Sequence, residues 1–445
     1  MKNLLVALSL ILTTFCQSQS WDYYGSSGFS TGISNYLSLG IDLASNDMYV
    51  ALQDNGNLGN LGIARFLDSE NDWEYMDGVS EVTVGMSDGP VTHIDLTIND
   101  EGRPAFSFIN TGFSNTLISG YLSPNNGFLR TGESINGGFF GNNSIATNIV
   151  FDVNGNRFIA AYSNNDLIVR RSNQYQAEIL NNTSITTFTF DFIYGTGYVA
   201  YSNLDDGGNI DIKKVNSNLN VTETYDNISD GLANYIDLKI SPLTIQPYVA
   251  YQDIANGGGV TVKKLNGDTW ELVGQQAFSD GLSNYVDLAF DVNGVPYVAF
   301  QDVSFSNKLS VMTYNGTTWE YVGERGVSPA SASYCSIELN SDGEIFVGFK
   351  DGSVSNKASV LRFGAALSID DNDLNNYVLS PNPANDKLTI DGVSDYDAKI
   401  YNNLGQFVME TTNTNTIDVS TLSKGIYFIK VSDGINSSTK KFIKN

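Results

Sequence analysis

Residues Tyr285–Asp302 read YVDLAFDVNGVPYVAFQD, two runs of alternating apolar residues on either side of a polar turn. A period of two residues is typical of paired β-strands. The segments Tyr235–Asp253 and Tyr334–Asp351 repeat the pattern, and weaker copies end at Asp54, Asn110, Asn164 and Asn203. The seven copies end at intervals of 56, 54, 39, 50, 49 and 49 residues. The chain therefore contains an internal repeat with a period of about 50 residues.

Each repeat continues with two more predicted strands. After Asp302, the run Lys308–Tyr314 is followed by the turn Asn315-Gly316 and then by Trp319–Gly323. Asn-Gly between alternating runs is a strong hairpin signal. One unit is thus four antiparallel strands, and such units at intervals of about 40 to 50 residues indicate propeller blades. The sequence predicts an all-β fold with a seven-bladed β-propeller over residues 21–365.

The two ends of this region complement each other. Residues 21–25 read WDYYG, a fourth strand with no first three strands before it, and the seventh unit stops after its third strand, Lys357–Phe363. Trp21 precedes Tyr36 by 15 residues, the same interval that separates Trp270 from Tyr285. We expect residues 21–25 to complete the last blade, which would remove two exposed sheet edges. The repeat resembles a broad bacterial class of YVAYxD-type propeller repeats, and this resemblance implies a fold but no activity.

The N-terminus has the features of a secretory signal peptide over residues 1–20. Lys2 precedes the apolar run Leu4–Leu12, and small residues follow at Cys16, Ser18 and Ser20. The run is shorter than the roughly 20 apolar residues that span a bilayer, and no later segment is long and apolar enough. A lipid anchor on Cys16 is the alternative, although bulky Phe15 precedes it. If Cys16 leaves with the signal, only Cys335 remains, and no internal disulfide can form.

The pattern changes after the predicted propeller. Residues 366–376 are acidic and rich in amides, as expected of a linker, and residues 377–445 follow. Four ordered motifs in this segment are SPNPAND from Ser380, IYNNLGQ from Ile400, LSKGIYF from Leu422 and the terminal KKFIKN from Lys440. They resemble the type A C-terminal sorting domain of the Bacteroidetes type IX secretion system. The sorting residues that this resemblance identifies are Pro381, Asn382, Pro383, Asn385, Gly405, Gly425, Lys440 and Lys444.

The resemblance implies a small Ig-like β-sandwich and a route through the periplasm and across the outer membrane. It also implies a partner, the type IX machinery, and a cargo that is either released or fixed to the cell surface. The alternative is a generic adhesive Ig-like module. The residues alone support only short strands separated by Asn and Gly turns, ending in a basic strand.

Charge excludes one class of partner. The chain has 24 Lys and Arg against 49 Asp and Glu, a net charge of −25, of which the predicted propeller carries −23. Nucleic-acid binding needs clustered Lys and Arg, so we expect no nucleic-acid partner. A domain of this charge attracts cations and avoids anionic membrane surfaces.

Two repeated features mark the predicted ligand face. The first is an aromatic residue that opens the first strand of five units: Tyr36, His93, Tyr235, Tyr285 and Tyr334. The third and fourth units depart, with Ala146 and about Thr186 in that place. Aromatic rings near a polar mouth suit stacking against sugars. The alternative is that the rings pack between blades.

The second feature is a polar residue that ends the second strand of each unit. Asp54, Asp253, Asp302 and Asp351 are candidate sugar or metal ligands, and Asn110, Asn164 and Asn203 take the same place in the other units. The alternative is that they cap the turns that follow, as Asp and Asn often do. A third set of acids, Asp95, Asp237 and Asp287, lies within the first strands near the expected axis, where each needs a partner or water.

The sequence contains few motifs that indicate catalysis or cofactor binding. Asp152–Gly155 and Asp291–Gly294 could be hairpin turns or parts of calcium-binding loops. Both lack the closing Glu of a calcium loop, so we expect turns. We expect no cofactor, with calcium as the alternative. A single His excludes multi-His metal centres and His-pair lyases, and a Ser triad would have to use His93. We therefore predict a non-catalytic binding or adhesion protein for a glycan or another surface. A polysaccharide-degrading glycosidase or lyase and a structural surface-layer component stay as alternatives.

Overall fold

The computed structural model describes residues 20–76, 87, 89–99, 101–112, 114–123, 127–129, 144–152, 154–171, 175–364, 378–391, 396–402, 406–412, 416–432 and 437–445. The chain divides into two compact units, residues 1–365 and 366–445, and each is considered by itself. Residues 1–19 of the expected signal peptide and the whole expected linker lie outside the described residues. No helix of the described part is long and apolar enough to cross a membrane.

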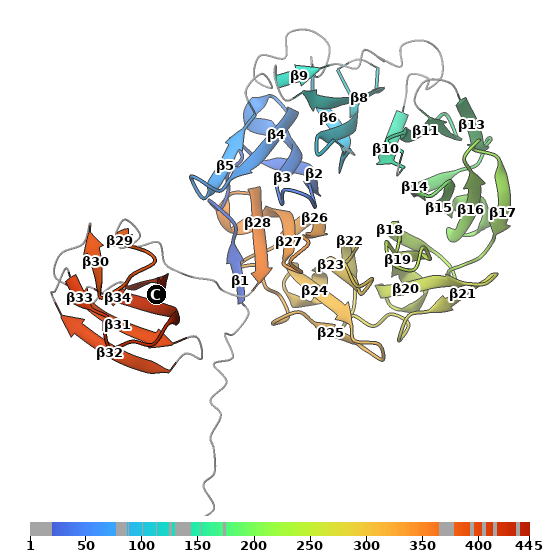
Figure 1. Ribbon diagram of the computed structural model, residues 1–445. Coiled ribbons are helices and arrows are strands. Elements are labelled where there is room, and N and C mark those ends of the chain that lie inside the picture. The colour runs from blue at the N-terminus through green and yellow to red at the C-terminus, as the bar shows by residue number, and fades with distance from the viewer. Residues whose placement is uncertain are drawn as a thin grey trace, which may run out of the picture. The chain divides into compact units, whose positions relative to one another are not determined.

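The described residues of the first unit form seven four-stranded antiparallel sheets around a common axis (Figure 1). Six of them are consecutive in the chain: β2–β5 (Ser34–Ile41, Met48–Asp54, Asn60–Leu67, Asp72–Tyr75), β6–β9 (Val91–Ile98, Pro104–Asn110, Thr116–Ser123, Gly127–Leu129), β10–β13 (Ser144–Phe151, Arg157–Ser163, Asp166–Arg171, Tyr175–Leu180), β14–β17 (Ile185–Ile193, Thr196–Asn203, Asn209–Asn216, Val221–Tyr225), β18–β21 (Ala233–Ile240, Pro247–Asp253, Gly259–Asn266, Thr269–Leu272) and β22–β25 (Ser283–Phe290, Pro296–Asp302, Lys308–Tyr314, Trp319–Tyr321). Single 3-10 turns follow five of the second strands: η1 (Asn55–Asn57), η2 (Leu204–Asp206), η3 (Ile254–Asn256), η4 (Val303–Phe305) and η5 (Gly352–Val354). The all-β prediction is confirmed.

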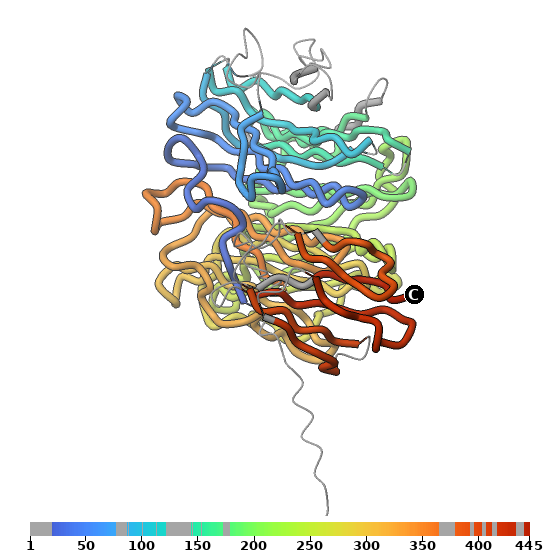
Figure 2. Tube along the Cα trace, turned by 60° about the vertical axis from the view of Figure 1, so that its left-hand side comes forward, coloured from blue at the N-terminus to red at the C-terminus, as the bar shows by residue number. Residues whose placement is uncertain are grey.

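The seventh sheet joins the two ends of the unit. It contains β26 (Ala332–Leu339), β27 (Ile345–Asp351) and β28 (Lys357–Gly364), and its fourth strand is β1 (Ser20–Tyr23). β1 pairs antiparallel with β28, with Trp21 opposite Phe363. The blue first strand accordingly lies against the orange last sheet in both views (Figures 1 and 2). The ring is therefore closed by hydrogen bonds between strands more than 300 residues apart in the chain.

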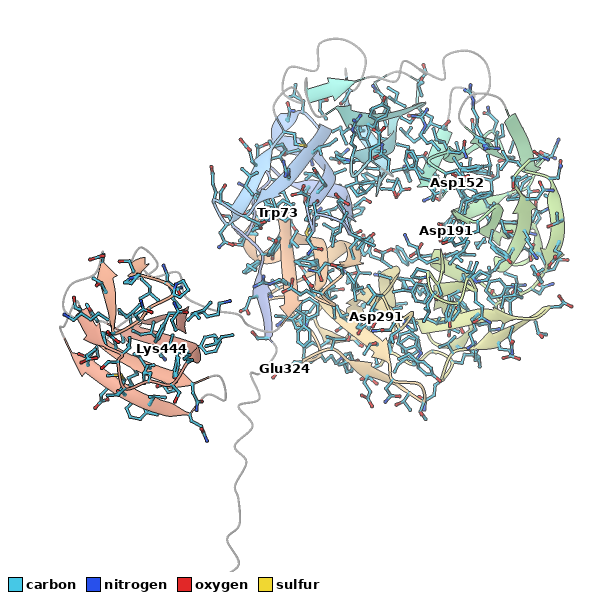
Figure 3. All side chains as sticks on the ribbon, viewed as in Figure 1. Trp73, Asp152, Asp191, Asp291, Glu324 and Lys444 are labelled. Atoms are coloured by element: carbon cyan, nitrogen blue, oxygen red, sulfur yellow. The ribbon has the colours of Figure 1, made fainter. Side chains whose placement is uncertain are left out.

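A girdle of side-chain hydrogen bonds joins the innermost strand of each sheet to the next around the axis. Each innermost strand has one polar residue at an equivalent position. The side-chain oxygen of that residue accepts a backbone N–H from the innermost strand of the next sheet, and the donor is the residue directly after the equivalent polar residue there. The acceptors are Ser38, Asp95, Asn148, Thr189, Asp237, Asp287 and Ser336, and the N–H donors are Leu96, Ile149, Phe190, Leu238, Leu288, Ile337 and Leu39, at 2.6 to 3.3 Å. Asp191, beside the axis in Figure 3, adds a further bond of 2.7 Å from the N–H of Ile240. The circle is complete, and it supplies the partners that Asp95, Asp237 and Asp287 require.

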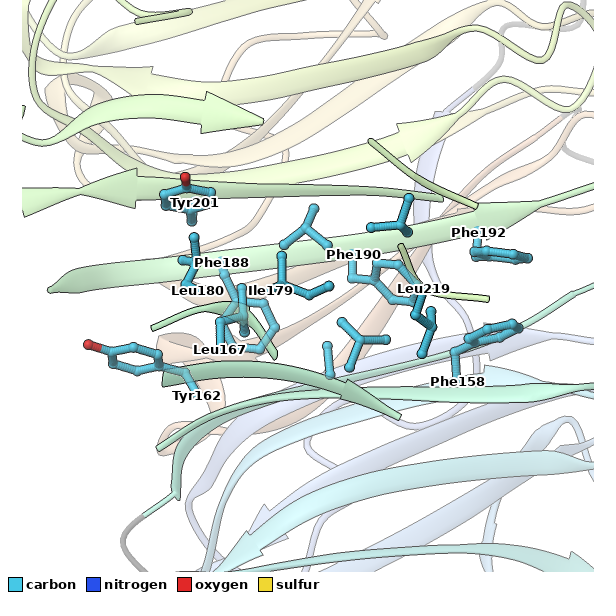
Figure 4. Packing of buried hydrophobic residues seen from close by; sticks show 14 of the residues in the cluster. Phe158, Tyr162, Leu167, Ile179, Leu180, Phe188, Phe190, Phe192, Tyr201 and Leu219 are labelled. Atoms are coloured by element: carbon cyan, nitrogen blue, oxygen red, sulfur yellow. The ribbon is translucent and has the colours of Figure 1, made fainter. Parts of the chain in front are cut away.

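The core lies between adjacent sheets. Every residue of β3, β7, β11 and β19 is buried, because both faces of these second strands pack against neighbouring sheets. Between the third and fourth sheets, Phe158 and Phe192 stack with ring centroids 4.1 Å apart (Figure 4). Fully burying a side chain of this size stabilises the fold by about 1.5–3 kcal/mol. The apolar second strands thus make sheet-to-sheet packing the main stabilising contact.

Tryptophans tie the outer strands of neighbouring sheets together. The indole N–H groups of Trp21, Trp73 and Trp319 donate to the carbonyl oxygens of Val322, Tyr24 and Val273 in the preceding sheet, at 2.8, 2.7 and 2.7 Å. Trp270 takes the equivalent position in β21, but its indole nitrogen is buried and has no hydrogen-bond partner. Three of the four tryptophans therefore contribute both packing and a hydrogen bond.

The second unit is a small sandwich of two sheets. One sheet contains β29 (Val378–Ser380), β30 (Lys387–Asp391) and β33 (Thr416–Asp418), and the other runs in the order β32 (Phe407–Thr412), β31 (Asp397–Asn402), β34 (Gly425–Ser432), β35 (Ser437–Lys444). One buried cluster joins the two sheets and includes Ile390, Ile400 and Phe442. Asn382 also binds the last strand, because its side-chain oxygen accepts the backbone N–H of Ile443 at 2.9 Å.

Candidate functional site

The five aromatic residues expected at the ligand face meet in one continuous arc. Ring centroids are 5.1 Å apart for Tyr235 and Tyr285, and 5.0 Å apart for Tyr285 and Tyr334. The series continues through Tyr36, 5.2 Å from Tyr334, to His93, 5.0 Å from Tyr36. We call this set of five residues the aromatic arc. It follows the fifth, sixth, seventh, first and second sheets around one end of the axis.

A backbone irregularity turns each ring of the arc. The aromatic residue is the third residue of its strand rather than the first, and the strand register shifts at that point in all five sheets. All five residues have a left-handed backbone, with φ between 46° and 53°. This conformation costs a non-glycine residue roughly 1–2 kcal/mol, and such bulges often re-aim a side chain. The sequence gives no sign of it, since left-handed positions usually carry Gly or Asn.

The arc has unused hydrogen-bonding groups. The four tyrosines are half-buried and His93 is exposed. Within the described part of the chain, none of the four tyrosine hydroxyls is hydrogen-bonded to another residue, and none is buried without a partner. Burial and the neighbouring tyrosines raise the pKa of Tyr285 to about 12, so its hydroxyl keeps its proton.

The arc is open at the third and fourth sheets. Ala146 takes the place of the aromatic residue in β10, as expected. In β14 the girdle register puts Thr187 there, one residue after the expected Thr186, because Thr189 occupies the girdle position two residues further on. Small residues at these two places leave an arc of five rings rather than a closed ring of seven.

A chain of amides runs beside the arc and was not foreseen from the sequence. In the first sheet, Asn35 donates to Gln53 at 2.7 Å, and Gln53 donates to the carbonyl oxygen of Val91 in the next sheet at 2.6 Å. Gln252 donates to Asn284 at 2.8 Å, which links the fifth and sixth sheets. Three repeats carried this signal, with Asn before Tyr36, Tyr235 and Tyr285 and Gln before the Asp that ends the second strand. These bonds hold neighbouring rings of the arc in a fixed relation.

Charged side chains line the axis beyond the girdle. Lys239 lies two residues after Asp237 on β18, and Glu338 lies two residues after Ser336 on β26. Burial alone would lower the pKa of Lys239, but Asp237, Glu338, Asp287 and Asp191 together raise it. Burial raises the pKa of Asp95 to about 6 and that of Glu338 to about 7.

Two of the axial acids, Asp237 and Asp287, are neighbours on adjacent inner strands, and we call them the acidic pair. Burial raises the pKa of Asp287 well above its usual value, and the nearby charge and hydrogen bond of Asp237 raise it further. Each member also accepts one backbone N–H, from Leu288 for Asp237 at 2.9 Å and from Ile337 for Asp287 at 2.7 Å. A neighbouring carboxylate therefore favours the neutral, protonated form of Asp287.

The carboxylates at the ends of the second strands are occupied by protein donors. Asp302, 2% exposed, accepts two bonds from Arg325 at 2.6 and 3.0 Å and one from the N–H of Phe305 at 3.1 Å. Asp54, 1% exposed, accepts from the backbone N–H groups of Thr31, Gly32 and Gly56 and from the hydroxyl of Tyr75. Burial would raise the pKa of Asp54, but these hydrogen bonds lower it.

The other members of this set lie in equivalent turns. Asp253 accepts from Asn256 and Thr261 at 3.0 Å. Asp351 accepts from the hydroxyl of Tyr23 on β1 at 2.7 Å, so the closing strand helps to fix the turn. Asn110 and Asn203 accept the backbone N–H two residues on, while Asn164 is left-handed at φ 54°. This arrangement is that of turn-capping residues.

The two segments considered for calcium are also turns. One oxygen of Asp152 accepts the N–H groups of Asn154 and Asn156, and one oxygen of Asp291 accepts those of Asn293 and Val295. Among the residues that the structure describes, no three His, Cys, Asp or Glu side chains are grouped as metal ligands would be.

The second unit matches a known family. Residues 379–445 match the family model described as a secretion system C-terminal sorting domain, which confirms the predicted sorting domain. The chain is therefore a type IX cargo that is secreted or attached to the cell surface. Of the sorting residues, Gly405 lies outside the described residues, Asn382 binds the last strand, and Pro381, Pro383, Asn385 and Gly425 are exposed. Lys444, by contrast, is buried and pairs in β35 with Gly425 of β34.

Solved structures resemble the rest of the chain. The BP39L lectin from Burkholderia pseudomallei aligns with a TM-score of 0.50 and 11% identity, over 76% of this chain and 97% of the lectin. A virginiamycin B lyase from Staphylococcus aureus aligns at 0.45 and 9% identity, over 78% and 100%. A lectin from Aleuria aurantia with a six-bladed propeller fold aligns at 0.44 and 13%, over 74% and 94%. The first likeness shows the propeller fold alone, and no curated protein matches the sequence.

Proposed function

We propose that this chain is a binding protein whose seven-bladed propeller, closed by β1, holds a glycan at the aromatic arc without catalysing a reaction. A signal peptide over residues 1–20 and a type A sorting domain over residues 377–445, joined by a linker at 366–376, deliver it through the periplasm to the outside of a Bacteroidetes cell.

The aromatic arc carries this proposal. Its five rings lie side by side at one end of the axis, with centroids 5.0 to 5.2 Å apart, and four of them offer free hydroxyl groups. Sugar rings have apolar faces that stack on aromatic rings and hydroxyls that pair with such polar groups. The lectin name of one structural relative fits this use. The assignment itself rests on the arc.

The carboxylates at the ends of the second strands support the site indirectly. Because their oxygens are filled by protein donors, Asp54, Asp253, Asp302 and Asp351 shape the loops of the same end rather than touch the ligand. We therefore assign ligand contact to Tyr36, His93, Tyr235, Tyr285 and Tyr334 alone.

No observation favours the glycosidase or lyase alternative. A glycosidase needs two carboxyl groups that are free to act on the sugar or on water. Asp237 and Asp287, which follow Tyr235 and Tyr285 on their strands, each accept a backbone N–H of the neighbouring sheet, so both already have a structural partner. A purely structural surface-layer role would leave the free hydroxyl groups of the arc without a use.

A glycan-array screen of the full chain tests the proposal. The wild type should retain one class of glycan, and Tyr285→Ala with Tyr334→Ala should abolish that binding. Tyr194→Ala is the matched control, because Tyr194 is 64% exposed in a turn between β14 and β15. The same proteins are compared by thermal melting. Lost binding with a melting temperature close to wild type supports the arc, whereas unchanged binding, or a loss that appears only with unfolding, contradicts it.

A further inference from the structure

We propose that the Tyr235–Tyr285 end of the aromatic arc is a subsite for a positively charged amino group, so that the preferred glycan contains an unacetylated amino sugar. The inference rests on the proposed function, because it names the ligand class of the same site.

Aromatic faces at this end suit a cation. The rings of Tyr235 and Tyr285 are 5.1 Å apart and inclined by 48°, so they contact each other and form one aromatic surface at this end of the axis. The negative face of an aromatic ring attracts ammonium groups within about 6 Å. The arc already holds one such group, since the Lys350 nitrogen lies 5.8 Å from the centroid of the Tyr334 ring. Asn35 accepts a hydrogen bond from that nitrogen, which leaves the Tyr235–Tyr285 end for a ligand.

The same two strands place an acidic pair beneath these rings. Asp237 follows Tyr235 by two residues on β18, and Asp287 follows Tyr285 by two on β22. The register shift lies between ring and acid on both strands, and regular pairing resumes at Asp237 and Asp287, so the acidic pair lies further along the strands than the rings. At the other end of the arc, His93 stands above a single acid, Asp95. The acidic pair thus distinguishes the Tyr235–Tyr285 end.

Ionisation of Asp287 is coupled to ligand binding in this proposal. Two adjacent carboxylates cannot both carry a negative charge without a compensating cation. Burial and the charge of Asp237 raise the pKa of Asp287, which favours a proton on this carboxyl group in the free protein. An ammonium group above the pair stabilises the doubly ionised state, and binding then releases a proton.

The other charges near the axis leave an acidic excess. Lys239 faces the pair from the next layer, with Asp191 and Glu338 around it. Asp95 contributes a further acid from the second sheet. With a net charge of −23 on the region, the surrounding field also favours a cationic ligand over an anionic one.

Titration calorimetry with a matched ligand pair tests this inference. The probes are a β-1,4-linked hexamer of glucosamine and its fully N-acetylated counterpart, each titrated into the full chain at mildly acidic pH in two buffers of different ionisation enthalpy. We expect the glucosamine hexamer to bind about tenfold more tightly, as a cation on aromatic faces allows. Its apparent enthalpy should differ between the buffers, because a proton is released.

The variants replace Asp by Asn, which removes the negative charge and keeps the size of the side chain. Asp237→Asn with Asp287→Asn retains the side-chain oxygens that accept the N–H groups of Leu288 and Ile337, so the girdle survives. This double variant should lose both the preference for glucosamine and the proton release. Asp95→Asn, in the same girdle beneath His93, should keep both. Melting curves of all variants check that the fold is intact.

Each remaining outcome is decisive. Equal binding of the two hexamers, or a preference that persists in the double variant, overturns the inference. If the array retains a neutral glycan while neither amino sugar binds, the inference fails and the proposed function stands. If no glycan of any kind binds, both fail.

Discussion

At the scale of single residues, the girdle explains why polar side chains occur inside strands that face the axis. Each one accepts a backbone N–H of the neighbouring sheet, for example Ser38 from Leu96 at 3.1 Å. An unsatisfied buried N–H costs about 1–3 kcal/mol. The sequence indicated that Asp95, Asp237 and Asp287 need partners, but it could not identify them, because the donors lie in another repeat about 50 residues away.

The girdle predicts the effect of a small substitution. Ser38→Ala removes only a hydroxyl group and leaves the N–H of Leu96 without its acceptor. The free energy of unfolding should fall by about 1–3 kcal/mol. Ser45→Ala, in the exposed turn between β2 and β3, should change it by less than about 0.5 kcal/mol. Denaturant unfolding of both variants measures the difference, and equal values would show that the girdle bond adds nothing.

The axial acids predict a dependence of stability on pH. Burial raises the pKa of Glu338 to about 7, while Lys239, Asp237 and Asp95 face it. An unfolded Glu has a pKa of about 4.3, so between about pH 4 and 7 the folded state holds a proton that the unfolded state has lost. This contribution to stability is present at low pH and is lost as the pH rises through the folded pKa.

Glu338→Gln should therefore melt higher than wild type at about pH 8, and close to wild type at about pH 4. Glu74→Gln, on the exposed outer strand β5, is the control and should melt as wild type throughout. Thermal melts across this range measure both. If Glu338→Gln keeps the wild-type dependence of melting temperature on pH, Glu338 does not cause that dependence.

At the scale of elements, the strands were predicted mainly from the internal repeat. Alternation, Asn-Gly turns and the Trp spacing predicted the four strands of the fifth and sixth sheets to within a few residues. What it could not predict is the left-handed residue within each inner strand, where Tyr and His adopt φ values of 46° to 53°. Residue type argues against that conformation, and only the packing of the neighbouring sheet imposes it.

The outer tryptophans offer a matched comparison at the element scale. Trp319→Phe and Trp270→Phe remove similar apolar area, but only Trp319 loses a hydrogen bond, to the carbonyl oxygen of Val273. The former should therefore cost about 1 kcal/mol more in the free energy of unfolding. Equal losses from the two substitutions would mean that the bond between β25 and β21 does not stabilise the ring.

At the scale of the whole molecule, the sorting unit and the propeller have separate tasks. The match over residues 379–445 gives the export route, which the motifs had already indicated. Deleting residues 377–445 should leave the protein in the periplasm of a type IX-competent host. Fractionation with an antibody against the propeller measures this, and wild-type amounts in the medium or on the surface would contradict the assignment.

The central claim is that a ligand binds at the aromatic arc. A crystal structure of the full chain with the glycan retained on the array tests it most directly. The account predicts sugar rings at the end of the axis, stacked against Tyr235, Tyr285 and Tyr334 and hydrogen-bonded to their hydroxyl groups. A glycan held between the outer strands, or at the opposite end of the axis, with nothing bound at the arc, would contradict it.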